Sequence, residues 1–245
     1  KDGYGINEHL IRYAYEEGVD TILTCDNGIA AVEQTKLAKS LGMTILITDH
    51  HEVQEEVPPA DAVVNPRQAD CPYPFKHLCG AAVAYKVICC LYEAYGIPKE
   101  ETEEFLEFAG FATVGDVMDL IGENRILVKE GLKRLNHTQN VGMASLIRAC
   151  GLEEKEIKSY HIGFVLGPRI NAGGRLDTAK RSLNLLLQKD RAKADVMAAE
   201  LKTLNDERKD MTQTGAEEAI EWIEKEGRSQ DKVLVVYLPD CHESL

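Results

Sequence analysis

The chain has 245 residues, of which 44% are hydrophobic, and its formal net charge at pH 7 is −13. This length and apolar content can bury the core of one large domain, or of one domain with an appendage. The sequence holds no run near the roughly 18 apolar residues of a membrane span, it begins unlike a signal peptide, and its seven cysteines form no C-x-x-C pair. We therefore expect a soluble, cytoplasmic protein without membrane association, disulfide framework or zinc knuckle.

The first part of the chain alternates helical periodicity with short apolar runs. A helix, a strand, a second helix and a second strand are expected, in that order, over residues 6–18, 21–26, 30–41 and 43–49. This order predicts a parallel βαβ unit, in which the active crevice lies beyond the carboxyl ends of the strands. Asp26 and the sequence Asp49-His50-His51 both fall at that edge.

Helices are expected to dominate the rest of the chain. Residues 52–78 hold five of the eight prolines, which predicts a long loop before a helix over 80–96 that is buried over much of its surface. Further helices are expected over residues 99–113, 124–136, 140–150, 153–163 and 177–188. A polar stretch from Asp190 to about Gly227 predicts a long, largely exposed connecting helix, and 232–238 is typical of a strand.

The expected fold class is α/β, with a parallel Rossmann-like sheet and flanking helices. A helical region follows, and then a long linker helix to a truncated second lobe. We assign residues 1–189 to the main domain, 190–228 to the connecting helix and 229–245 to the start of the second lobe. The chain stops too soon after its last expected strand for that lobe to fold.

Asp49, His50 and His51 follow an expected buried strand, so their side chains can be aimed into one crevice. A His-His pair in a loop is more often solvated than metal-binding. Here Asp26 ends the neighbouring strand, and the Asn-Gly pair after it allows a tight turn that leaves the carboxylate pointing out of the sheet. The alternative for Asp26 is a cap on the following helix.

Asp116 interrupts the otherwise apolar segment 112–120. A buried carboxylate is costly unless it is paired or binds a metal. Asp116 is therefore a ligand candidate, with a helix cap or a salt bridge as the alternative, and Asp119 is the weaker choice. Carboxylates with imidazole suit manganese or magnesium, and the histidine favours manganese.

The glycine-rich segment GPRINAGGR (167–175) carries Arg169, Asn171 and Arg175 just ahead of a helix. Guanidinium groups match phosphate oxygens, and glycines let backbone amides approach them. We expect a phosphate-binding loop, with a structural loop bearing exposed arginines as the alternative. The acidic net charge argues against a broadly basic surface for binding nucleic acid. A local basic pocket would offset that charge at the binding site.

Six short blocks together resemble the RecJ-type exonucleases of the DHH phosphoesterase family. In chain order they are DGYG (2–5), CDNG (25–28), TDHH (48–51), CGAAVAYK (79–86), ATVGDVMDL (112–120) and GPRINAGGR (167–175). The resemblance implies that the main domain is a DHH domain. It also implies a metal-dependent 5′–3′ exonuclease that acts on single-stranded DNA in DNA repair and recombination, with the polarity resting on the resemblance alone.

The resemblance further implies two divalent ions, Mn²⁺ or Mg²⁺, in the complete protein. Asp26 would bridge the ions, His50 would bind one of them, and Asp116 would complete the ligand set. His51 would face the scissile phosphate, and Asp49 would orient the two histidines. Two ions about 4 Å apart activate a water molecule and stabilise the charge of the transition state.

Tyr4 and Arg175 match family positions that contact the 5′ end of the strand, and Arg169 and Asn171 belong to the same segment as Arg175. The family's Asp-x-Asp motif should precede Lys1 and is absent. We therefore expect the chain by itself to bind at most one ion weakly and to hydrolyse little or nothing. The expected partners are single-stranded DNA and replication or repair proteins.

Three other functions share parts of this pattern. A DHH phosphodiesterase for very short RNA or cyclic dinucleotides would share the metal residues, but blocks 79–86 and 167–175 favour the exonuclease. An inactive replication scaffold would not need the intact acidic and histidine residues. A metal-dependent pyrophosphatase of the same superfamily would require Lys and Arg in the second lobe, which is missing here.

Overall fold

The computed structural model describes residues 5–239 and residue 241. The chain divides into two compact units, residues 1–137 and 138–245, and each is described by itself. No helix within the described ranges is both long and apolar enough to cross a bilayer.

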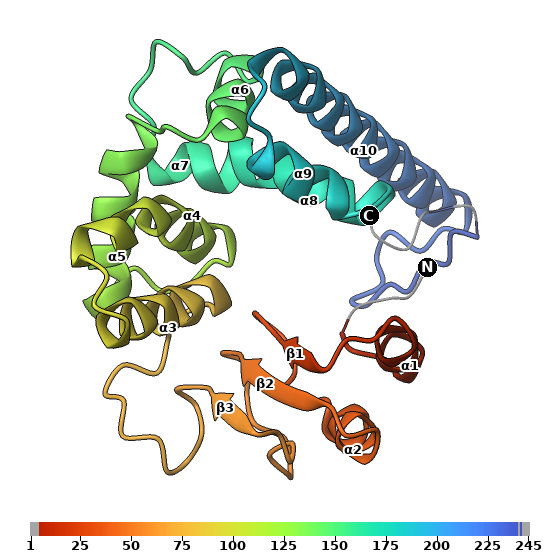
Figure 1. The fold of residues 1–245 in the computed structure, drawn as a ribbon. Helices are drawn as coiled ribbons and strands as arrows, with labels where there is room; N and C mark the ends of the chain where they lie inside the picture. The colour runs from red at the N-terminus through yellow and green to blue at the C-terminus, as the bar shows by residue number, and fades with distance from the viewer. Residues whose placement is uncertain (1–4, 240, 242–245) are drawn as a thin grey trace. The chain divides into compact units, whose positions relative to one another are not determined.

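The first unit contains a parallel sheet of three strands in the order β1-β2-β3, with bounds Thr21–Leu23, Thr44–Thr48 and Ala62–Val64 (Figure 1). Ile22 pairs with Ile45, and Ile47 pairs with Val63. The central strand β2 is the most buried of the three, because Ile45 and Ile47 are at most 1% exposed. The predicted parallel βαβ unit is thus confirmed, and β3 lies in a segment for which the sequence predicted a loop.

The two helices predicted around the first strand are present as α1 (Glu8–Glu16) and α2 (Val32–Ser40). The Asn7 side chain caps α1 by accepting a hydrogen bond from the Leu10 amide at 2.9 Å, which satisfies one of the free amides at the helix start. Both helices contribute to one apolar cluster beneath the sheet, formed by Ile11, Ala38, Met43 and Ile45. This packing fixes the strands whose carboxyl ends carry Asp26 and Asp49.

Helices make up the remainder of the first unit. They are α3 (Gly80–Ala94), the 3₁₀ helix η1 (Lys99–Phe105), α4 (Leu106–Gly115) and α5 (Gly122–Leu135). The sequence overestimated the burial of α3, since Leu91 is 49% exposed and only the first turn, with Ala82 and Val83, is deeply buried. A second apolar cluster joins α3 to α5 through Leu78, Val83 and Leu127.

Helices α4 and α5 cross closely because each carries a glycine at the contact. A Cβ atom on Gly131 would lie 2.7 Å from the Leu106 carbonyl oxygen and 2.9 Å from the Gly110 Cα, which is closer than such atoms can approach. Asp116 follows the last residue of α4. The crossing therefore sets the position of a candidate ligand.

The second unit is helical throughout its regular structure. Its elements are α6 (Val141–Ala149), α7 (Ser159–His161), the π-helical turn η2 (Ile162–Leu166), α8 (Gly167–Leu176), α9 (Lys180–Leu187) and α10 (Arg191–Lys225). Three predictions were wrong here. Residues 153–158 are not helical, because the buried side chains Leu152 and Ile157 do not share one helical face.

The second wrong prediction concerns 167–175, which forms α8 rather than a loop. Its glycines serve close packing: a Cβ atom on Gly173 would lie 3.1 Å from Ser182 Oγ, and one on Gly167 would lie 2.8 Å from the Ile162 carbonyl oxygen. Burial of Ala172 against the neighbouring helices offsets the roughly 1 kcal/mol that each helical glycine costs.

The long helix predicted after Asp190 is present as α10, and Asp190 caps it by accepting a hydrogen bond from the Lys193 amide at 3.1 Å. Its first half is less exposed than expected, because Ala194, Ala198 and Leu201 are buried. Residues 232–238 do not form the predicted strand, since they pair with no other strand in the described structure. Val235 is 88% exposed there. The domain boundaries drawn from the sequence remain predictions.

We expect Gly131→Ala to lower the free energy of unfolding by about 1–3 kcal/mol, because the added methyl group would force α4 and α5 apart. Helix propensity alone predicts the opposite sign, a gain of about 1 kcal/mol. Urea unfolding followed by circular dichroism measures the change. Gly115→Ala in α4 is the matched control, because no heavy atom lies within 4 Å of its added methyl group. Equal stability of the two variants would contradict the proposed close crossing.

Candidate metal centre

Asp26 lies in a strained turn directly after β1. Its φ angle of 60° falls in the left-handed region, which is costly for a residue with a Cβ atom. Gly28 has a φ of 114° and packs against Ile47, and the Thr24 hydroxyl donates to the Asn27 carbonyl oxygen at 2.6 Å. The turn predicted from the Asn-Gly pair is therefore present. Asp26 does not cap α2, whose N-cap is Ala31.

The carboxylates of Asp26 and Asp116 converge on one imidazole nitrogen. His50 Nε2 lies 3.0 Å from Asp26 Oδ1 and 3.5 Å from Asp116 Oδ2. The His50 side chain is 8% exposed, whereas the two carboxylates are 52% and 45% exposed. Within the described structure neither ring nitrogen of His50 makes a hydrogen bond of good geometry. The buried imidazole thus lies against two carboxylates without a hydrogen bond of good geometry to either of them.

The two carboxylates and the imidazole perturb one another. The carboxylate of Asp26 is the main cause that raises the pKa of His50, and Asp116 adds to this effect against the opposing influence of burial. Burial raises the pKa of Asp116, the charge of His50 opposes that rise, and the nearby charge of Asp26 adds to it. Two carboxylates this close repel each other, and a cation between them would relieve that repulsion.

Asp49 is the structural anchor of the neighbouring loop. It is 1% exposed, and it accepts hydrogen bonds from the backbone amides of Ile29 at 2.9 Å and His50 at 2.7 Å. The His51 ring lies on the same carboxylate, with Nδ1 2.7 Å from Oδ1. Burial raises the pKa of Asp49, but these hydrogen bonds outweigh it and leave the pKa below its ordinary value. Asp49 thus orients the His51 side chain directly and His50 through its backbone.

Backbone strain marks both sides of the centre. Among the described non-glycine residues, positive φ angles occur at Asp26 and at Val117, whose φ is 55°. Val117 follows Asp116 at the end of α4, where its amide and the Met118 amide close the helix by bonding to carbonyl oxygens of the last turn. Such strain persists where surrounding structure enforces it, and it is concentrated at functional sites.

Two residues that shape the candidate centre were not identified from the sequence. Gly80 starts α3 beside Asp26, and a Cβ atom on it would overlap the Asp26 side chain. Asn65 is 1% exposed and donates a hydrogen bond to the His51 carbonyl oxygen at 2.9 Å. Gly80 lies in the sequence block 79–86 that resembles the family. Only the structure shows that a larger residue at this position would overlap the Asp26 side chain.

The donor set fits a divalent cation. Asp26, His50 and His51 present potential ligand atoms that lie within 4.8 Å of one another, and Asp116 also reaches His50. Two carboxylates with imidazole nitrogen form the mixed oxygen and nitrogen environment that manganese accepts. Asp116 rather than Asp119 faces His50, as the sequence favoured.

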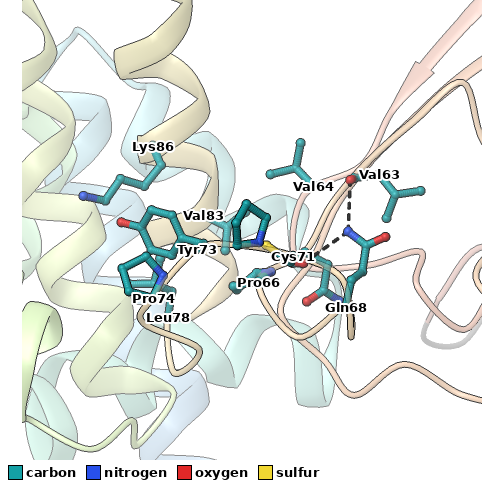
Figure 2. Close-up of a pocket in the computed structure, with 12 residues that line it drawn as sticks. Val63, Val64, Pro66, Gln68, Cys71, Tyr73, Pro74, Leu78, Val83 and Lys86 are labelled. Atoms are coloured by element: carbon teal, nitrogen blue, oxygen red, sulfur yellow. Dashed lines mark hydrogen bonds between the residues drawn. The ribbon is translucent and has the colours of Figure 1, made fainter.

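A separate cavity of about 460 Å³ lies beside the loop after β3 and does not have this chemistry (Figure 2). It is mostly apolar, and its charged lining residue Lys86 is paired with Glu123. Tyr73 also donates to Glu123, at 2.8 Å. Without carboxylates in its wall, this cavity does not compete with the Asp26 cluster as a cation site.

The predicted phosphate-binding residues belong to the second unit. Asn171 and Arg175 are exposed on α8, while Arg169 is 9% exposed and donates from Nη1 to the Val165 carbonyl oxygen at 2.6 Å. Tyr4 lies outside the described residues. The roles assigned to these residues from the sequence remain predictions.

Comparison with known proteins gives a consistent result. Residues 4–115 match the model of the DHH family, N-terminal domain. The single-stranded-DNA-specific exonuclease RecJ of Bacillus subtilis is 40% identical over 235 residues, which are 96% of this chain and 29% of that protein. The enzyme of the same name from Escherichia coli is 33% identical over 258 residues, covering 100% of this chain and 45% of its own length. The chain thus spans less than half of these relatives.

Two solved structures are also similar. A crystal structure of exonuclease RecJ bound to manganese has a TM-score of 0.87 and 32% identity, with coverage of 100% of this chain and 60% of that one. The crystal structure of RecJ from Thermus thermophilus in complex with Mn²⁺ has a TM-score of 0.82 and 31% identity, and covers 98% of this chain and 35% of that one. The parallel sheet with flanking helices is therefore an arrangement that proteins of this name share.

We expect Gly80→Ala to weaken Mn²⁺ binding by tenfold or more, because the methyl group would displace Asp26 from His50. Isothermal titration with Mn²⁺ measures the affinity. Gly215→Ala in α10 is the control, since its added methyl group meets only ordinary contacts of 3.5 Å and beyond. Unchanged Mn²⁺ affinity in a folded Gly80→Ala variant would show that Asp26 is not a ligand.

Proposed function

Because residues 4–115 belong to the DHH family, we propose that this chain carries the metal centre of an exonuclease that hydrolyses single-stranded DNA. The observation that carries the proposal is the convergence of the Asp26 and Asp116 carboxylates on the buried Nε2 atom of His50. Support comes from the relatives named as single-stranded-DNA-specific exonucleases and from the manganese in the similar structures. The cellular role that follows is DNA repair and recombination in the cytoplasm.

In this proposal Asp26, His50 and Asp116 hold Mn²⁺ or Mg²⁺. Bound divalent ions lower the pKa of a water molecule and stabilise the negative charge that develops on the phosphate. The carboxylates supply negative charge for the cation, and the partial burial of the centre strengthens that attraction. Release of the repulsion between Asp26 and Asp116 adds to the binding free energy.

His51 acts on the substrate rather than on the ion. Its Nδ1 atom is held by Asp49 Oδ1 at 2.7 Å, which favours the tautomer with the proton on Nδ1. Nε2 is then left to exchange a proton or a hydrogen bond with a phosphate oxygen. Asp49 and Asn65 hold this ring and its backbone, so they position His51 without touching the substrate.

We assign the second unit to recognition of the strand. Arg175 and Asn171 are exposed on α8 and offer donors for phosphate oxygens. Tyr4 completes the proposed set, whereas Arg169 is buried and holds the helix through the Val165 carbonyl oxygen. Binding of the 5′ phosphate by these residues would make cleavage proceed from the 5′ end, and replication or repair proteins are the expected partners.

The central test is hydrolysis by the full-length protein of a 5′-phosphorylated single strand and of the matching duplex, in Mn²⁺. We expect nucleotides to be released from the 5′ end of the single strand, and Asp26→Ala or His50→Ala to lower the rate by at least a hundredfold, because each removes a ligand. Asp70→Ala and His9→Ala alter exposed residues of the same types and should leave the rate unchanged.

Three outcomes would contradict the proposal. Cleavage that survives both ligand substitutions would place the centre elsewhere. Digestion restricted to very short RNA or cyclic dinucleotides would change the substrate class. Strand binding without Mn²⁺-dependent cleavage would indicate a scaffold.

The roles of the two histidines can be separated by their dependence on Mn²⁺. We expect His50→Ala to raise the Mn²⁺ concentration for half-maximal rate by tenfold or more, because its Nε2 faces both carboxylates. We expect His51→Ala to lower kcat at saturating Mn²⁺ without changing the Mn²⁺ affinity. Titration of the rate with Mn²⁺ and direct calorimetry measure both quantities. A parallel loss of Mn²⁺ affinity in His51→Ala would make His51 a ligand, as its proximity to Asp26 and His50 allows.

A further inference from the structure

Two aromatic side chains of the second unit are stacked in the open. The rings of Tyr160 and Phe164 have centroids 5.0 Å apart and an interplanar angle of 29°. Tyr160 is 63% exposed and Phe164 is 69% exposed. Large aromatic rings normally gain stability by burial, so an exposed stacked pair retains free area for another planar group.

The local fold holds this pair in a fixed position. Tyr160 lies in α7, where the Lys158 amide donates to His161 Nδ1 at 3.0 Å, and the His161 ring packs edge-on against Tyr160 with centroids 5.8 Å apart. Phe164 lies in the π-helical turn η2, which Arg169 braces through the Val165 carbonyl oxygen. π-Helical turns are rare and frequently occur at functional sites.

The pair lies in the same helical run as the proposed phosphate-binding residues. Elements α7, η2 and α8 run without interruption over residues 159–176. Tyr160 is stacked on Phe164, and Asn171 and Arg175 lie four residues apart on the same side of α8, seven residues beyond Phe164. All four are exposed, whereas Arg169 on another side is buried.

We propose that Tyr160 and Phe164 form a stacking platform for the bases of single-stranded DNA, next to the donors that bind its phosphates. The proposal rests on the function proposed above and extends it to residues outside the metal centre. The rise of an α-helix puts Phe164 and Arg175 about 16 Å apart along the axis, so they would contact different nucleotides of one strand. Stacking tolerates any base, because every base has a π face.

The chemistry of this face favours a nucleic acid over a protein partner. An interface with another protein would be expected to continue the apolar surface, but here the rings give way to the amide of Asn171 and the guanidinium of Arg175. Planar rings followed by phosphate donors match the alternating bases and phosphates of a single strand. A platform of this kind also supplies affinity without a broadly basic surface, consistent with the net charge of −13.

The test compares binding of a DNA strand with hydrolysis of a mononucleotide ester, which is too small to need the platform. In the full-length protein, Phe164→Ala and Tyr160→Ala should each weaken binding of a 5′-phosphorylated oligodeoxythymidine roughly tenfold, measured by fluorescence anisotropy in EDTA. Both variants should hydrolyse the p-nitrophenyl ester of thymidine 5′-phosphate in Mn²⁺ as the wild type does. Phe164→Tyr keeps a ring and should bind normally. Tyr95→Ala, which removes a ring that is 80% exposed at the end of α3, is the matched control.

An oligonucleotide with abasic sites identifies stacking as the cause. Removal of the bases should weaken binding to the wild type. It should have a smaller effect on Phe164→Ala, because that variant has already lost the contact between the ring and the base. Unchanged strand affinity in both alanine variants would contradict the proposed stacking platform. The aromatic pair would then be a candidate contact for a protein partner. Failure of the proposed function would look different, because the wild type itself would then not degrade the strand in Mn²⁺.

Discussion

The buried carboxylate of Asp49 is the interaction on which the candidate centre depends. It joins the loop after β2 to the segment before α2 by accepting the Ile29 amide, and it holds the backbone of His50 and the ring of His51. A charge buried to this degree is tolerated because its hydrogen bonds are nearly complete. The same bonds decide which way both histidines face. Without them the loop would be free to move, and His50 would not be held opposite Asp26.

Small residues provide the space that the charged groups need. Gly80 lets Asp26 pass close to the start of α3, and the contact between Gly110 and Gly131 brings α4 to the position from which Asp116 reaches His50. The centre is therefore built by three separate parts of the first unit: the turn after β1, the loop after β2 and the end of α4. Strain at Asp26 and Val117 is the local cost of this convergence.

The second unit uses glycine differently. In α8 the glycines permit close helix packing, and the face opposite that packing carries Asn171 and Arg175. The preceding elements α7 and η2 add an exposed aromatic pair to the same run of helix. A rigid helical surface can hold a flexible strand more precisely than a loop, because fewer of its own conformations must be given up on binding.

The sequence by itself predicted most regular elements of the first unit and named the residues of the candidate centre. Short apolar runs marked β1 and β2, and helical patterns marked α1 and α2. The polar residues that follow the two runs named Asp26, Asp49, His50 and His51 as one cluster. Asp116 was also named, because an acidic residue in an apolar segment requires a partner. These signals are local or follow from the rule that parallel strands end at one edge.

Only the tertiary structure decided the features that arise from long-range packing. β3 is three residues long and forms because β2 offers it an edge, which no local pattern reveals. The segment 167–175 carries loop-like glycines, yet it is helical, because the packing of its buried residues opposes the low helix propensity of those glycines. The space beside Gly80 and the stacking of Tyr160 on Phe164 likewise depend on how backbones approach in three dimensions, and a sequence records residue types but not those distances.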